Sequence, residues 1–132
     1  MANDNTEFKL NPGSGVPYYR QIIDQVLLGL ADGHFSPGAQ LPTVRQLAVD
    51  LSVNLNTVAK AYREMEIRGI VETQQGTGTF ISSRKVHKTS YERKKALQEL
   101  VDQHIALAAS KGISIDEIVE AFVERAEKAN RR

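Results

Sequence analysis

The chain contains two short helical patterns of apolar residues, one directly after the other, within residues 41–69. In each pattern the apolar side chains recur at intervals of three and four residues, which places them on one face of a helix. The inward-facing positions are Val44, Leu47, Ala48 and Leu51 in the first pattern, and Val58, Ala61, Tyr62 and Met65 in the second. Ser52 and Val53 form a tight turn between the two patterns, so the segment predicts a helix-turn-helix.

Capping residues support the boundaries of both helices. Thr43 with Gln46 three residues later has the sequence of a capping box, which predicts the start of the first helix. Asn54 is a favourable N-cap for the second helix, and Gly69 is suited to close it.

Two further patterns complete a domain around this motif. Before it, Pro17 and apolar residues at helical spacing predict a helix that Gly33 ends. Its apolar positions are Tyr19, Ile22, Ile23, Val26, Leu27 and Leu30. After it, residues 70–82 alternate in polarity around Gly76-Thr77-Gly78, which predicts a β-hairpin. Three helices followed by a hairpin predict a winged helix-turn-helix domain over residues 16–83, behind an N-terminal arm at residues 1–15 in which Phe8 and Leu10 form a short strand or a clasp.

The remaining chain predicts two more amphipathic helices in residues 91–132, after a basic linker at residues 84–90. The fold class is therefore mainly α with a small β-hairpin. Two helices cannot enclose a core alone, so we expect this tail to form a symmetric homodimer. Packing of the tail on its own winged domain is the alternative. The residues expected at the dimer interface are Leu97, Leu100, Val101, His104, Ile105, Ala108, Ile118 and Phe122.

The composition excludes several classes of protein and of functional site, and it indicates no particular function. With 41% hydrophobic and 25% charged residues, the chain is an ordinary globular protein. No segment has the length and hydrophobicity of a membrane span, and the N-terminus has no signal-peptide pattern, so we expect a cytoplasmic protein. The absence of cysteine excludes disulfides, thiol catalysis and thiolate metal sites.

Charge is informative only through its distribution. The net charge is +1, but residues 84–95 contain six basic residues and a single acid, Glu92. Such a stretch is compatible with contact to DNA phosphates, and equally with a solvated linker.

The outward face of the second motif helix carries candidate groups for reading DNA. Asn56 can offer a paired donor and acceptor to adenine, and Thr57 is short enough to reach a base methyl or a phosphate. Lys60 and Arg63 are better suited to phosphates, and Arg45, in the first turn of the preceding helix, can reach a groove edge. A solvated helix face would also explain these residues one by one, and Asn54 is equally well explained as a cap alone.

The tip of the hairpin is the second candidate contact. Gly76 and Gly78 have no Cβ and allow the tip to approach a phosphate or the minor groove, while Gln75 and Thr77 supply polar groups. Tight-turn chemistry alone explains the glycines nearly as well.

An enzyme is not indicated by the sequence. His34, His87 and His104 do not have the spacing of metal ligands, and neither a nucleophile motif nor a phosphate-binding glycine loop is present. We therefore expect no cofactor. A winged helix that binds proteins is the alternative. Such a module would not need Arg45, Asn56, Thr57 and Lys60 together on one face.

Several stretches together resemble the DNA-binding domain of the GntR family of bacterial transcription regulators. They are G-H-F-S-P-G-A-Q-L-P-T-V-R-Q-L-A from Gly33 to Ala48, V-N-L-N-T-V, and G-T-G-T-F, within a match over residues 16–82. The resemblance implies DNA contact by Arg45, Asn54, Asn56, Thr57 and Gly76. Many family members have arginine where this chain has Leu55 and Ala59, so Lys60 or the basic segment is expected to compensate.

The length of the tail resembles one branch of that family. About fifty residues follow the hairpin, which is similar to the YtrA subfamily with its short, dimerising two-helix tail. This resemblance implies a homodimer on a palindromic DNA operator, repressing its own operon together with genes for an ABC transporter. An activator stays open as an alternative, and the sequence identifies no small-molecule effector.

Overall fold

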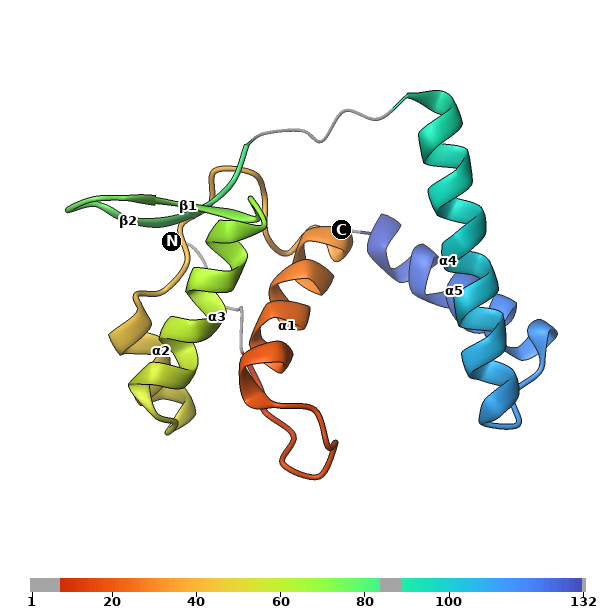
Figure 1. The fold of residues 1–132 in the computed structure, drawn as a ribbon, viewed down its shortest axis with the longest axis horizontal. Coiled ribbons are helices and arrows are strands. Elements are labelled where there is room, and N and C mark those ends of the chain that lie inside the picture. The colour runs from red at the N-terminus through yellow and green to blue at the C-terminus, as the bar shows by residue number, and fades with distance from the viewer. Residues whose placement is uncertain (1–7, 84–88, 132) are drawn as a thin grey trace. The chain divides into compact units, whose positions relative to one another are not determined.

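The computed structural model describes residues 8–83 and 89–131. Within them the order of elements is α1 (Tyr18–Asp32), α2 (Val44–Leu51), α3 (Leu55–Ile67), β1 (Val71–Gln74), β2 (Gly78–Ile81), α4 (Ser90–Ser110) and α5 (Ile115–Asn130) (Figure 1). This confirms the predicted fold class, three helices and a hairpin followed by two helices. No helix of the described residues is both long and apolar enough to cross a membrane.

The chain divides into two compact units, Met1–Arg84 and Lys85–Arg132. Most of the linker expected at residues 84–90 lies outside the described residues, which resume at Thr89. Thr89 is already the N-cap of α4, so the helix begins inside the range expected for the linker.

The core of the first unit forms around α3, which contacts α1, α2 and β1. Val58, Ala61 and Met65 on its inner face are completely buried, as the helical spacing predicts. Ile22 and Val26 are the matching buried positions of α1. Leu27, which we expected on the same face of α1, is instead partly exposed, because it lies at the edge of the buried stripe.

Local hydrogen bonds and backbone angles define both ends of α2 and the start of α3. The Thr43 hydroxyl accepts the Gln46 N–H at 3.0 Å, whereas the Gln46 side chain donates to Asp50, so only half of the expected capping box forms. Ser52 has left-handed backbone angles, φ 55° and ψ 46°, which end α2 sharply. Asn54 then caps α3 by accepting the Asn56 N–H at 2.7 Å.

The wing contains a third extended segment that the sequence pattern did not predict. β1 and β2 pair antiparallel, with Val71 opposite Ile81. On the other edge of β2, residues 38–41 exchange hydrogen bonds with it: Gly38 N–H donates to Ile81 O, Ile81 N–H to Ala39 O, and Leu41 N–H to Thr79 O, at 2.8 to 2.9 Å. The chain before α2 is thereby tied to the hairpin after α3.

The N-terminal segment is held on α1 by two glutamine side chains one helical turn apart. Gln25 accepts the Lys9 N–H at 2.8 Å and donates to the Lys9 carbonyl, and Gln21 makes the same pair with Asn11. Phe8 packs on the core near Phe35, with ring centroids 6.3 Å apart. The described part of the expected arm therefore forms a clasp and not a strand.

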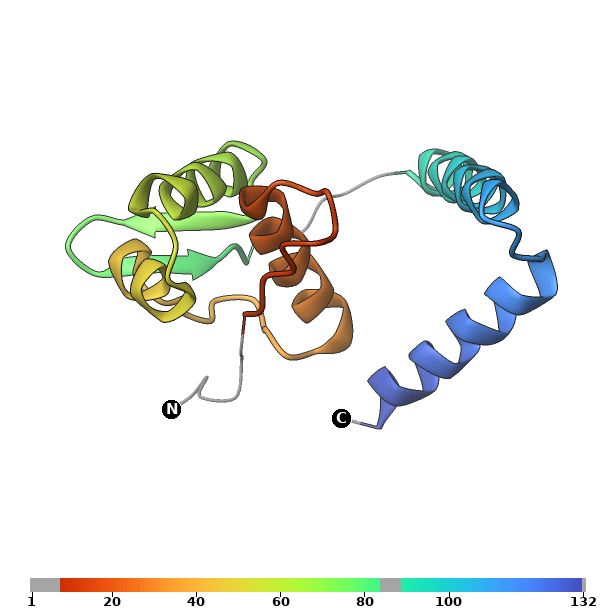
Figure 2. The ribbon, with the colours of Figure 1, turned by 90° about the horizontal axis from the view of Figure 1, so that it is seen from below.

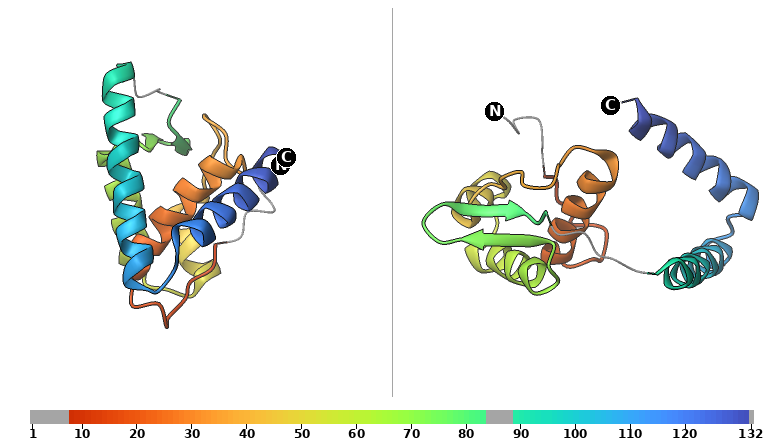
Figure 3. Two further views of the ribbon diagram at one scale, coloured as in Figure 1. Left: turned by 90° about the vertical axis from the view of Figure 1, so that its right-hand side faces the viewer. Right: turned by 90° about the horizontal axis from the view of Figure 1, so that it is seen from above.

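The second unit is a helical hairpin with well-formed ends. Thr89 with Glu92, and Ser114 with Glu117, each form a complete capping box. The backbone N–H of Ser114 donates to Glu117 at 2.9 Å, and this bond lowers the pKa of that carboxyl. α5 turns back from the end of α4 and diverges from it (Figure 3). Ala108 is the one residue of α4 and α5 that is fully buried among those described.

We expect the Tyr62→Phe substitution to lower the free energy of unfolding by about 1 kcal/mol, the usual net contribution of one buried hydrogen bond. The Tyr62 hydroxyl donates to the Pro42 carbonyl at 2.6 Å, which joins α3 to the segment that leads into α2. Burial raises the pKa of this phenol above its ordinary value. Urea unfolding followed by circular dichroism measures the change. Tyr91→Phe, at an exposed tyrosine of α4, is the matched control. Equal unfolding free energies for both variants would contradict the assignment.

Candidate DNA-binding surface

Three elements contribute the polar residues that the sequence singled out: the start of α2, the first turns of α3, and the tip of the hairpin. In Figures 1 and 2 the hairpin tip and α2 lie on the side of the winged unit away from α1, and α3 contacts both α1 and α2. The buried face of α3 points into this unit, so the opposite face of the helix is open to solvent. A nucleic acid can reach this face, because no other described element of the unit covers it.

The beginning of α3 presents its side chains from a rigid frame. The Asn54 side-chain oxygen is occupied by the Asn56 N–H, so Asn54 serves first as a cap that fixes the helix start. Asn56 is exposed, and its side-chain amide forms no hydrogen bond with another described residue. Thr57 is half-buried beside it. Asn56 is therefore the residue whose donor and acceptor are free for a base edge.

The three cations that we expected on this surface differ in their surroundings. Arg45 and Arg63 are exposed and make neither a hydrogen bond nor an ion pair with any described residue. The Lys60 ammonium lies over the Tyr19 ring, 4.1 Å from its centroid, in a cation–π contact. The charge of Lys60 is thus held beside α1, whereas the two guanidinium groups are free to bind phosphates or base edges.

The tip of the wing is a tight turn whose residues Gln75, Gly76 and Thr77 are exposed. Thr77 N–H donates to the Gln74 carbonyl at 2.9 Å, which closes the turn around Gln75 and Gly76. Gly76 has φ 79°, a conformation that favours glycine, and a Cβ built there would meet no atom within 4 Å. The tip can therefore approach a partner closely.

Gln40 is a positioning residue that sequence reasoning missed. It lies on the extended segment beside β2, and its side-chain amide donates to the Thr77 carbonyl at 3.2 Å. A Cβ at Gly78 would come within 2.5 Å of this amide, so glycine at that place lets Gln40 brace the tip. Residues 38–41 are too short for their alternation to have revealed a strand.

The histidines of the described residues do not form a metal site. His87 lies outside the described residues, and among the others no group of three His, Asp or Glu side chains is placed to hold a metal ion. His104 lies on α4, where its ring nitrogen Nδ1 hydrogen-bonds the Leu100 carbonyl at 2.7 Å.

Comparison with known proteins agrees with this geometry. Residues 18–81 match the family model described as bacterial regulatory proteins, gntR family. The chain is also 37% identical over 116 residues to the HTH-type transcriptional repressor YtrA of Bacillus subtilis strain 168, covering 88% of this chain and 89% of the relative. The chain belongs to the GntR family. This GntR protein is accordingly a member of a family of transcription regulators and not of an enzyme family.

Solved structures show the same relationship. YtrA from Sulfolobus acidocaldarius, a GntR-family transcription factor, matches with a TM-score of 0.54 at 30% identity, covering 92% of this chain and 98% of that one. The DNA-binding domain of AraR in complex with operator ORX1 matches with a TM-score of 0.50 at 27% identity, covering 55% of this chain and 90% of that one. The first similarity extends over both units, and the second covers about half of this GntR protein.

We expect Arg45→Ala to weaken specific DNA binding by about 1–3 kcal/mol if the guanidinium contacts a base edge. Binding of a duplex from the promoter of the protein's own gene, measured by fluorescence anisotropy against nonspecific DNA, tests this. Arg20→Ala, at an exposed arginine of α1, is the matched control and is expected to leave the affinity unchanged. A folded Arg45→Ala protein with the affinity of the parent would remove Arg45 from the contact.

Proposed function

We propose that the protein is a transcriptional repressor that binds a palindromic operator as a homodimer and controls its own operon, together with genes for an ABC transporter. The observation that carries the proposal is the open face at the start of α3, where Asn56 is unpartnered, with the free guanidinium of Arg45 on α2 and the wing on the same unit. The residues proposed to contact DNA are Arg45, Asn54, Asn56, Thr57, Lys60, Arg63, Gln75, Gly76 and Thr77.

The proposed mode of binding places the first turns of α3 in the major groove. Residues at the start of a recognition helix reach base edges, while cations around it hold phosphates and set the register. Asn56 supplies a paired donor and acceptor, and Arg45 a guanidinium. The wing tip then lies against the neighbouring sugar-phosphate backbone.

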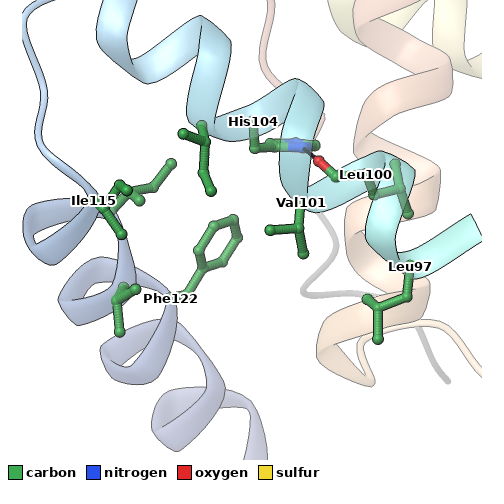
Figure 4. A pocket seen from close by; sticks show the side chains of 9 residues that line it. Leu97, Leu100, Val101, His104, Ile115 and Phe122 are labelled. Atoms are coloured by element: carbon green, nitrogen blue, oxygen red, sulfur yellow. Dashed lines mark hydrogen bonds between the residues drawn. The ribbon is translucent and has the colours of Figure 1, made fainter. Parts of the chain in front are cut away.

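Dimerisation is proposed from the apolar surface of the tail. Side chains from α4 and α5 surround a groove of about 480 Å³ whose lining is almost entirely hydrocarbon (Figure 4). Its lining residues are Leu97, Leu100, Val101, His104, Ile105, Ile115, Ile118, Val119 and Phe122. Burying a surface of this kind against a second copy removes it from water, which favours association.

The groove changes the expected interface in two ways. Ile115 and Val119 line the groove beside Ile118 and Phe122, although neither was among the residues expected at the interface. Ala108 does not line it and is already buried in the single chain, so we withdraw it as an interface residue. Its small side chain supports the turn between α4 and α5, where its carbonyl accepts the Ile113 N–H at 2.9 Å.

A symmetric dimer would explain a palindromic operator. Two copies related by a two-fold axis present two α3 helices to two half-sites, whose separation is about 34–36 Å for one turn of DNA or a multiple of it. Repression is supported by the likeness to the B. subtilis repressor, and follows physically where the bound site overlaps a promoter.

Footprinting on the upstream region of the protein's own operon, with a reporter assay in the host, tests the function. We expect protection of a palindromic site that overlaps the promoter, and higher reporter expression after deletion of the gene. Protection upstream of the promoter with lower expression after deletion would indicate an activator. Absence of any protected site would favour a protein-interaction module.

We expect Leu100→Glu to convert the dimer into a monomer, because the substitution places a charge on a surface that must lose its water on association. Light scattering coupled to size-exclusion chromatography measures the mass. Leu28→Glu on α1 is the matched control, since Leu28 is 49% exposed and Leu100 is 50% exposed. A Leu100→Glu protein that stays dimeric while keeping its helical content would remove this face from the interface.

A further inference from the structure

Two apolar side chains stand on the otherwise polar outer part of α3. Leu55 is the first residue of the helix and is 41% exposed, and Ala59, four residues later, is half-buried. Residues four apart are neighbours on one face of a helix, so the two form a short apolar strip. The strip runs beside Asn56 and Lys60, which are four residues apart in the same way.

Core packing does not account for the position of Leu55. The buried face of α3 is complete without it, since Val58, Ala61, Tyr62 and Met65 supply the inward contacts. A single exposed leucine is common on protein surfaces and has no meaning by itself. What distinguishes Leu55 is its place between Asn54 and Asn56, in the turn that the proposed function directs at base edges.

We propose that Leu55, with Ala59 behind it, packs on the C5-methyl group of a thymine in the major groove and is a specificity-determining residue of the operator contact. This proposal rests on the proposed function. The major groove identifies thymine by its C5-methyl group, which cytosine lacks, whereas guanine presents the N7 and O6 acceptors.

The chemistry of leucine gives selectivity in both directions. Contact with the thymine methyl buries hydrocarbon on both sides, which is favourable. A guanine in the same place would have its N7 and O6 acceptors covered by a side chain that has no donor, and a cytosine would lack the methyl group and bring its N4 amino group beside the leucine. Those groups would lose hydrogen bonds to water without replacement, which is unfavourable. Leu55 therefore favours thymine at this position by contact with its methyl group, and disfavours guanine and cytosine by desolvation of their polar groups.

Methyl deletion in the DNA tests the contact directly. The full-length protein first selects an operator duplex from random DNA, and each thymine of one half-site is then replaced singly by deoxyuridine, which lacks only the methyl group. We expect one of these replacements to weaken binding about fourfold, the effect of burying one methyl group on an equilibrium constant. Replacement in both half-sites is expected to give about fifteenfold, since the two half-sites multiply.

The variants assign the effect to Leu55. In Leu55→Ala the same replacement is expected to have no effect, and Leu55→Arg is expected to select guanine at that position, since arginine pairs with guanine O6 and N7. Ile67→Ala is the matched control, because Ile67 is 80% exposed at the opposite end of α3 and should keep the full fourfold loss.

The results distinguish a failure of the Leu55 contact from a failure of the proposed function. Two results would overturn the role of Leu55 and leave the proposed function intact, provided that the protein binds a specific operator. In the first, Leu55→Ala loses as much affinity on each deoxyuridine replacement as the parent protein does. In the second, no deoxyuridine replacement lowers the affinity of the parent protein. A selection that recovers no sequence over nonspecific DNA overturns the proposed function, and the role of Leu55 with it.

Discussion

The position of α3 depends on the packing of its inner face, where Val58, Ala61 and Met65 are completely buried against α1, α2 and β1. Close approach of α2 requires small or compact side chains there, because interiors are filled to crystal-like density and leave no space for a larger residue. The same contact fixes the rotation of the helix about its axis. Asn56 and its neighbours face outward for this reason, and a shift of the core would turn all of them together.

A second set of bonds ties this helix to the wing. The Tyr62 hydroxyl donates to Pro42, in the segment that leads into α2, and residues 38–41 pair with β2, so the elements on either side of α3 are joined to each other. Gln40 extends this connection to the tip through the Thr77 carbonyl. The start of α3 and the wing tip are therefore parts of one braced body, which reduces the entropy that two separate contacts with a rigid duplex would cost.

Local signals made much of this predictable. The caps at Asn54 and Ser114 act on backbone groups two or three residues away, and helical spacing reports burial directly, so the fold class follows from short windows of sequence. The third segment of the wing, the clasp of Gln21 on Asn11, and the Lys60 contact with Tyr19 join residues that are distant in sequence. Such contacts depend on the assembled fold. Without them, the sequence cannot show which of the candidate cations already contacts another side chain.

The low net charge of the molecule explains why a second copy matters for the proposed DNA binding. The whole chain has a net charge of +1, and residues 1–84, which include the winged unit, contain seven Lys and Arg residues against eight Asp and Glu residues. Nonspecific attraction of one winged unit to the phosphates is therefore small. Each phosphate contact adds affinity that salt screens, so a few free arginines provide only weak binding at cellular ionic strength. In the proposed dimer, coupling the winged units of two copies through the groove of α4 and α5 would make the second DNA contact intramolecular and so raise the affinity of the pair. In a dimer of this kind, association of the apolar tails raises the affinity for DNA that the low charge leaves small. Base contacts at the start of α3 can then determine which DNA sequence is bound.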